Sequence, residues 1–231
     1  MTIRPLNENA ALVSFENRID LDTNQKVIAL DRILHATPFS GFIETAPAYS
    51  SLAVFYDINQ VKSTNPNCET AFDFVKEYIE INFKKRKGVD PGFDKDAIGI
   101  PVLYDGEDLG FVSNNHQLTK EEAIAIHSSM EYRVFMIGFL PGFAYMGTLD
   151  ERIATPRKSS PRMHVPAGSI GIAGLQTGIY PQASPGGWQL IGRTPLKIFR
   201  KEKPEPCLFS PGDRVHFYSI NQNEFEHLNE Y

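Results

Sequence analysis

Arginines beside proline or glycine are the residues of this sequence best suited to bind an anion. Arg157 and Arg162 each follow a proline, and Arg193 follows a glycine. A guanidinium group presents a rigid fork of N–H donors that matches a carboxylate or a phosphate. We expect these arginines to bind such an anion. The alternative is that they form ion pairs with surface carboxylates such as Asp150 or Glu151.

Histidines and the single tryptophan add further candidates. His116 and His164 are candidates for general acid–base catalysis, because an imidazole titrates near neutral pH. His127 is expected at the end of a helix, where the helix dipole favours a charged ring. Trp188, the one tryptophan, could stack on a ligand or pack in a core. No histidine or cysteine has the spacing of a zinc ligand set, so we predict no metal site.

The stretch from residue 135 to residue 195 is rich in glycine and proline, which together hold loops rigid. Rigid loops are good supports for a binding site. The segment 168–174 resembles a phosphate-binding loop, but it lacks the lysine and the following helix of such a loop. It therefore favours tight turns of a β-barrel.

Composition narrows the function classes. The chain has 231 residues and a formal net charge of −5, which argues against a nucleic-acid partner. No apolar run approaches the ~18 residues of a membrane span, so we expect no membrane partner. The two cysteines, Cys68 and Cys207, lie far apart. Reduced thiols and a cytoplasmic location are expected.

The first ninety residues alternate strand and helix patterns. Strands are predicted at 11–15, 42–45 and 51–56, and helices at 22–35 and 69–83. The order β-α-β-β-α is most of a split-βαβ unit. The pattern breaks between 84 and 96, where a basic run, Lys84 to Lys87, leads from the second helix into a predicted linker.

We place a domain boundary near residue 90, giving an N-terminal α+β domain at 1–90 and a second domain at 91–231. In the second domain a strand is predicted at 98–104, and Thr119 to Glu122 forms a capping box that opens a short helix. From Tyr132 onward, short apolar runs alternate with turns, which is typical of a β-barrel or sandwich. The predicted fold class is α+β.

Several motifs, in order along nearly the whole chain, resemble the KipI family, also called allophanate hydrolase subunit 1. That family includes the B subunit of the prokaryotic 5-oxoprolinase. The matching segments are 139–145, 155–157, 161–162, 165–174, 176–181 and 184–188, and the segments 10–15, 47–52 and 210–215 also fit.

The resemblance implies a small N-terminal split-βαβ-type domain followed by a cyclophilin-like β-barrel domain. It implies a component of a multi-component, ATP-dependent 5-oxoprolinase, an amide (lactam) hydrolase that converts 5-oxo-L-proline to L-glutamate and is inactive without its partners. The partners would be a KipA-like subunit, PxpC, and a PxpA subunit of the LamB/YcsF type. ATP would be the co-substrate, with Mg²⁺ supplied or shared by a partner.

On this resemblance we expect two sets of site residues, with no cofactor-binding residue assigned. The expected catalytic residues are Arg157, Arg162 and His116. The expected substrate-binding residues are Tyr145, Gln176, Tyr180, Trp188 and Arg193. Two alternatives stay open: a KipI-type inhibitor of a sensor histidine kinase, and a carboxyltransferase-like or allophanate hydrolase-associated subunit.

Overall fold

The computed structural model describes residues 1–16, 20–85 and 96–229. The chain divides into two compact units, Met1–Phe93 and Asp94–Tyr231. The boundary predicted near residue 90 lies outside the described residues, as do Arg86 and Lys87 of the basic run. Each unit has its own hydrophobic core, so each is described by itself.

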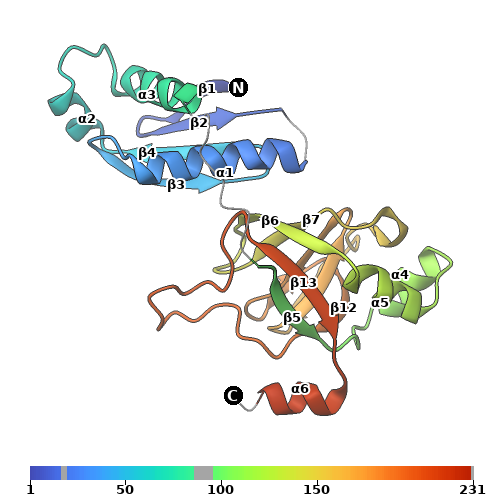
Figure 1. Cartoon of the computed structure of the whole chain (residues 1–231). Coiled ribbons are helices and arrows are strands. Elements are labelled where there is room, and N and C mark those ends of the chain that lie inside the picture. The colour runs from blue at the N-terminus through green and yellow to red at the C-terminus, as the bar shows by residue number, and fades with distance from the viewer. Residues whose placement is uncertain (17–19, 86–95, 230–231) are drawn as a thin grey trace. The chain divides into compact units, whose positions relative to one another are not determined.

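The first unit is a four-stranded antiparallel sheet with helices on one face (Figure 1). The sheet order is β1-β2-β4-β3, so β4 lies between β2 and β3 and is antiparallel to both. Strands β2 and β3 are therefore parallel to each other and are joined through α1, which confirms the split-βαβ prediction. The strands are β1 (Thr2–Asn7), β2 (Ala10–Ser14), β3 (Phe42–Pro47) and β4 (Ser51–Tyr56).

Its helices are α1 (Leu21–Ala36), α2 (Ile58–Thr64) and α3 (Ala71–Lys85). Asp20 caps α1 by accepting from the backbone N–H of Thr23, and Asp57 caps α2 through Gln60. The side chains of β4 alternate between half-buried and buried, and the buried ones pack with α1 and α3 in one core. Strand β1 and helix α2 were not predicted, because β1 is mostly exposed and α2 has only one buried residue.

The second unit is a barrel-like sheet of seven strands in the order β12-β9-β10-β7-β6-β13-β5 (Figure 1). Its two edges meet just beyond β5, where Leu103 and Arg193 exchange backbone hydrogen bonds of 2.9 Å in both directions. The strands are β5 (Ile98–Val102), β6 (Glu131–Ile137), β7 (Ala144–Gly147), β9 (Ser169–Ala173), β10 (Gln176–Ile179), β12 (Gln189–Arg193) and β13 (Arg214–Ser219).

The remaining elements surround this sheet. They are α4 (Leu109–Asn115), α5 (Lys120–Ser128), the 3-10 turn η1 (Glu151–Ile153), the strand pair β8 (Arg162–Val165) and β11 (Ser184–Gly186), and α6 (Gln222–Asn229). The predicted capping box is present: Thr119 and Glu122 each accept from the other's backbone N–H. The segment 168–174 holds β9 and the turns on either side of it, as predicted. No helix among the described residues is long and apolar enough to cross a membrane.

His127 is a buried member of the barrel core rather than a charged helix end. Its ring is 1% exposed, with Nδ1 2.7 Å from the hydroxyl of Tyr104 and Nε2 3.0 Å from Oγ1 of Thr177. Burial lowers the pKa of His127 to about 3, so the ring is neutral at pH 7. The sequence-based expectation of a charged ring was wrong because desolvation outweighs the helix dipole at this position.

Candidate functional site

A buried carboxylate fixes the loop that carries the predicted arginines. The side chain of Asp108 is 8% exposed, forms ion pairs with Arg162 and with Lys158 at 3.3 Å, and accepts from the backbone N–H of Leu190 at 2.7 Å. Arg162 also pairs with Glu107 and donates to the carbonyl of Trp188 at 3.2 Å. Arg162 therefore ties β8 to the sheet.

Asp150 and Glu151 are not the acids that these arginines contact. Asp150 instead binds Arg152, at 2.8 Å. Arg157 is exposed, and no acidic partner is found for it within the ranges that the structure describes. The two Pro-Arg pairs thus have different surroundings: Arg162 is held by acids, and Arg157 is available to a ligand.

Four of the residues expected at the site line one small cavity, which we call the aromatic pocket. They are Tyr145, Arg157, Tyr180 and Trp188. The cavity has a volume of about 220 Å³. It is completed by Phe139, Phe143, Pro161, Pro185, Gly186 and Gly187.

The rings of the aromatic pocket pack edge to face, the arrangement that aromatic quadrupoles favour. Phe143 lies at the centre, with ring centroids 5.4 Å from Trp188, 4.9 Å from Tyr145 and 5.3 Å from Tyr180. Phe143 and Trp188 are almost fully buried, whereas Phe139 is 61% exposed. The pocket wall is therefore rigid, and Phe139 stands at its open side.

Arg157 is the charged group of this pocket. Its guanidinium carbon lies 5.8 Å from the centre of the Trp188 ring, within range of a cation–π interaction. Burial raises the pKa of Tyr145 and Tyr180, and the positive charge of Arg157 acts in the opposite direction on both. Both phenols are protonated at neutral pH, and Arg157 gives the pocket a positive potential.

The backbone of Gly186 lies so close to the ring of Tyr180 that only glycine fits at this position. A Cβ atom on Gly186 would lie 2.4 Å from the hydroxyl oxygen of Tyr180. A side chain at this position of β11 would displace the Tyr180 ring. The neighbouring Gly187 is different, since the nearest atoms to a Cβ there lie 3.7 Å away.

A second cavity, of about 450 Å³, shares Arg157 with the aromatic pocket, and we call it the polar pocket. Its walls are Phe111 and Asn115 of α4, Gln189 of β12, and the loop residues Thr155, Pro156, Arg157, Lys158, Ser159 and Ser160. The loop is fixed by the backbone bond from Lys158 to Gly187, at 2.7 Å, and by the amide of Gln189, which donates to the carbonyl of Pro156 at 2.8 Å.

The structure places the other expected residues outside the aromatic pocket. Arg193 pairs with Asp105 at 2.8 Å and stacks on the ring of Phe225 at 4.5 Å. Gln176 pairs with Ala173 in the sheet and lines neither pocket. His116 lies behind the polar pocket, with Nε2 3.2 Å from Oγ1 of Thr155.

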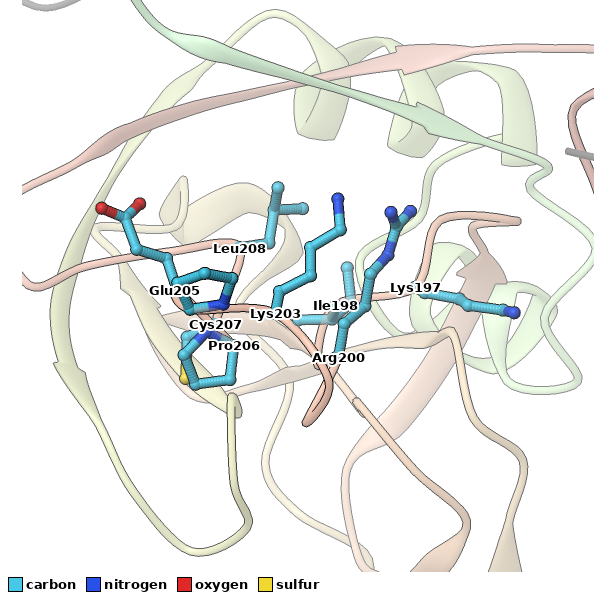
Figure 2. A pocket seen from close by; sticks show the side chains of 9 residues that line it. Lys197, Ile198, Arg200, Lys203, Glu205, Pro206, Cys207 and Leu208 are labelled. Carbon is cyan, nitrogen blue, oxygen red and sulfur yellow. The ribbon is translucent and has the colours of Figure 1, made fainter.

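A third cavity, of about 520 Å³, belongs to a hairpin at residues 197–208, and none of the expected site residues lines it. The hairpin is held by backbone bonds from Arg200 to Pro206 and from Leu208 to Ile198. Figure 2 shows the side chains of Arg200 and Lys203 extending to the same side. The basic side chains of this hairpin pocket therefore lie outside the candidate site.

Sequence reasoning missed Asp108, Gln189 and Phe111. Asp108 precedes a short helix, α4, in a segment for which no helix or strand was predicted. Gln189 follows Trp188, and only the tryptophan of this pair was predicted to contact a ligand. Phe111 gave one usable signal, because it is a large apolar residue shortly before the polar run from Ser113 to Gln117. Among the residues with described positions, no group of three or more His, Cys, Asp or Glu side chains could hold a metal ion.

The fold and these cavities define a two-unit α+β protein whose barrel-like unit carries a cavity of small-molecule size. A family model described as the carboxyltransferase domain, subdomains C and D, matches residues 1–209. The chain therefore belongs to this family.

Within the family the chain is similar to B subunits of 5-oxoprolinase. The 5-oxoprolinase B subunit of Bacillus subtilis (strain 168) is 44% identical over 227 residues, covering 96% of this chain and 94% of that protein. The corresponding B subunit of Escherichia coli O157:H7 is 37% identical over 215 residues, covering 92% of this chain and 93% of that protein. These matches confirm the resemblance seen in the motifs.

Solved structures agree with the fold. The crystal structure of TTHA0988 matches 95% of this chain with a TM-score of 0.77 and 31% identity, and this chain spans only 41% of TTHA0988. The urea amidolyase of K. lactis matches with a TM-score of 0.71 at 18% identity, which shows a shared fold alone.

Proposed function

We propose that this chain is the B subunit of an ATP-dependent 5-oxoprolinase, which opens the lactam ring of 5-oxo-L-proline to give L-glutamate. Similarity to 5-oxoprolinase B subunits over more than nine tenths of both chains supports this function. The observation that carries it is the aromatic pocket with Arg157 at its wall. We also infer a cytoplasmic location, which the two free cysteines favour.

The aromatic pocket suits a small flat ring that carries a carboxylate. A cavity of about 220 Å³ is below the ~300–1,000 Å³ of pockets for drug-sized ligands, and so fits a metabolite of the size of 5-oxoproline. Aromatic walls would pack on the faces of the lactam ring. The guanidinium of Arg157 would bind the carboxylate, and the protonated phenols of Tyr145 and Tyr180 could donate to the lactam oxygen.

The other expected residues take supporting roles in this proposal. Arg162 and Gln176 would position the strands around the pocket, and His116 would orient the loop through Thr155. Arg193 would stabilise the edge of the sheet. We propose substrate contact for Tyr145, Arg157, Tyr180 and Trp188 alone.

Partner subunits would complete the active site, so we expect the isolated chain to be inactive. In TTHA0988 the region similar to this chain is part of a much longer polypeptide, which is consistent with a site shared between this module and another. A KipA/PxpC-like subunit is the expected direct partner, with a PxpA-like subunit as the third component. Mg²⁺ would enter with ATP and take its ligands from a partner.

The two alternatives have less support. The relatives that share most of the chain at high identity carry the name of a 5-oxoprolinase subunit, and the urea amidolyase likeness is one of fold. No feature of the pockets favours an inhibitor of a histidine kinase, because such a role would use an exposed apolar surface rather than a small cavity.

The function is tested by co-expressing this chain with PxpA-like and PxpC-like subunits and measuring glutamate release from 5-oxoproline and ATP. We expect release only from the complete set. No turnover by a correctly assembled complex, or full turnover without this chain, would contradict the proposal.

Two arginine variants then separate binding from structure. Arg157→Ala should lower kcat/KM for 5-oxoproline by about 100-fold, the scale of one lost charged contact, with unchanged stability. Arg162→Ala should instead lower the free energy of unfolding by about 3 kcal/mol, because it leaves the buried carboxylate of Asp108 with Lys158 as its one ion-pair partner among the described residues. Lys203→Ala, which removes a cation from the hairpin pocket, is the control and should change neither quantity. Equal effects of the two arginine variants would rule out these separate roles.

A further inference from the structure

We propose that Phe139 closes the aromatic pocket over its ligand and thereby sets the size of the ring that the pocket admits. The inference rests on the proposed function and deepens it, because the ligand is the lactam acid held beside Arg157. Phe139 was not among the residues expected from the sequence, and it adds a fifth substrate contact to the four proposed above. Its role is to determine specificity, with no part in proton transfer. Its exposure, its backbone conformation and the anchoring of its turn support this role.

Phe139 forms the open side of the pocket wall. Phe143, Tyr180 and Trp188 are 4% exposed or less, and Tyr145 is half-buried. Phe139 is 61% exposed, and its ring meets Phe143 edge to face with the centroids 5.5 Å apart. This is the one ring contact of Phe139 within the described part of the chain. Exposed side chains change rotamer within nanoseconds, so the Phe139 ring is free to turn while the other walls stay fixed.

The backbone conformation of Phe139 is unusual for its residue type. Its φ angle is +71°, in the left-handed region where glycine and asparagine are common and a bulky side chain is rare. Outliers of this kind cluster at active sites and where the protein clamps a ligand. A glycine would fit this backbone with less strain. The aromatic ring itself is therefore the feature that accounts for a phenylalanine at this position.

The turn that carries Phe139 is firmly anchored. It joins β6 to β7 and is closed by two backbone hydrogen bonds of 3.0 Å, from Gly138 to Phe143 and from Phe143 to Leu140. The side chain of Leu140, next to Phe139, packs against the hydrophobic cluster that contains Phe143. The backbone therefore holds Phe139 at the rim of the pocket, and its side chain is the part that can move.

A turn of the Phe139 ring over the pocket would have two consequences for a bound lactam acid. It would exclude water from the ion pair between the carboxylate and Arg157, and an ion pair is stronger away from water. It would also cover the open side of the lactam ring. A larger ring would occupy the space that Phe139 needs, so closure would favour five-membered rings.

The test compares two lactam acids as substrates of the complex of this chain with its partner subunits. They are 5-oxoproline and 6-oxopipecolate, the homologue with a six-membered ring. The wild type should prefer 5-oxoproline by at least about tenfold in kcat/KM, the scale of one methylene group in a pocket. Phe139→Ala should lower this preference at least about fivefold.

The separate kinetic constants identify what Phe139 does. Phe139→Ala should raise the KM for 5-oxoproline about tenfold and change kcat less than about threefold, because the ring contacts the ground state and the transition state alike. Phe139→Tyr, which keeps an aromatic ring, should stay within about twofold of the wild type in both constants.

Two further variants control for strain and for surface changes. Phe139→Gly should match Phe139→Ala in its kinetics but melt about 3 °C higher, because glycine adopts a positive φ without strain. Met163→Ala should change no kinetic constant, because Met163 of β8 is 85% exposed and lines neither the aromatic pocket nor the polar pocket. Calorimetry measures the binding of both lactam acids to the full chain and to the complex for the same variants.

The outcomes separate this inference from the proposed function. If the complex turns over 5-oxoproline but shows no preference between the rings, or the same preference in Phe139→Ala, the inference fails and the function stands. Weaker assembly of Phe139→Ala with an unchanged KM would make Phe139 a contact of a partner subunit, and would also overturn the inference. Binding that depends on Phe139 and on ring size, without turnover, would give the reverse result. No binding to chain or complex, and no turnover, would overturn both.

Discussion

At the scale of single residues, the contrast between Arg157 and Arg162 defines the site. The two follow prolines five positions apart, and their sequence surroundings are almost the same. Asp108 and Glu107 bind Arg162, while Arg157 lies against Trp188 and borders two cavities. An arginine already held by two acids is a poor ligand for a further anion, because its charge is largely compensated. Arg157 is therefore the better candidate for contact with a substrate.

His127 gives a prediction for the pH dependence of stability. The folded protein holds the ring neutral with a pKa of about 3, whereas the unfolded chain has the ordinary value of about 6.5. Between these values the unfolded state binds a proton that the folded state does not, so the free energy of unfolding should fall as the pH falls from 6.5 towards 3. The slope from this residue is at most ~1.4 kcal/mol per pH unit.

The measurement is urea unfolding of the wild type and of His127→Gln at a series of pH values between 7 and 4. Carboxylates contribute to both slopes, so the difference between the two proteins isolates the histidine. In the variant, the free energy of unfolding should fall less steeply as the pH is lowered, because the contribution of His127 is gone. This holds even if the variant is less stable than the wild type at pH 7. Parallel slopes would show that the ring is not buried in its neutral form.

At the scale of elements, the short strand β11 shapes the aromatic pocket through Gly186. Gly186→Ala would place a methyl group 2.4 Å from the Tyr180 hydroxyl and force the ring into the cavity. We expect the KM for 5-oxoproline of the assembled enzyme to rise about tenfold or more, the effect of one misplaced methyl group in a binding pocket. Gly187→Ala is the control, since a Cβ there meets nothing closer than 3.7 Å. A KM that is unchanged in Gly186→Ala, or raised equally in both, would contradict this account of the pocket.

At the scale of the whole molecule, two separate cores predict two unfolding steps. Leu52 is fully buried in the core of the first unit, and Trp188 reports on the second unit alone because it is the one tryptophan of the chain. Leu52→Ala should lower the stability of the first unit by about 2–5 kcal/mol. The midpoint followed by Trp188 fluorescence should stay where it is, while the far-UV circular dichroism loses part of its signal at lower urea. A shift of both signals together would show that the units unfold as one.

The elements of the first unit were largely predictable from local patterns. The apolar spacing of α1 and α3 and the alternation of β4 place their core residues on one face, which is a local property of the sequence. Strand β1 was missed because it pairs with β2 at the edge of the sheet and has little buried surface to mark it. The polar side chains of α2 hid that short helix in the same way.

Periodicity, turn residues and motif order are read along the chain, and they were enough to predict the α+β class, the split-βαβ unit, the barrel-like second half and the region that holds the aromatic pocket. Which residues of that region share a cavity depends on contacts between distant segments, and these appear only once the chain is folded. Arg162 meets Asp108, which lies 54 positions away, and Arg193 meets Asp105 at a separation of 88. Such pairs form because the barrel closes on itself, bringing α4 beside β12. Closure compensates the charges of Arg162 and Arg193 and leaves Arg157 between the aromatic pocket and the polar pocket.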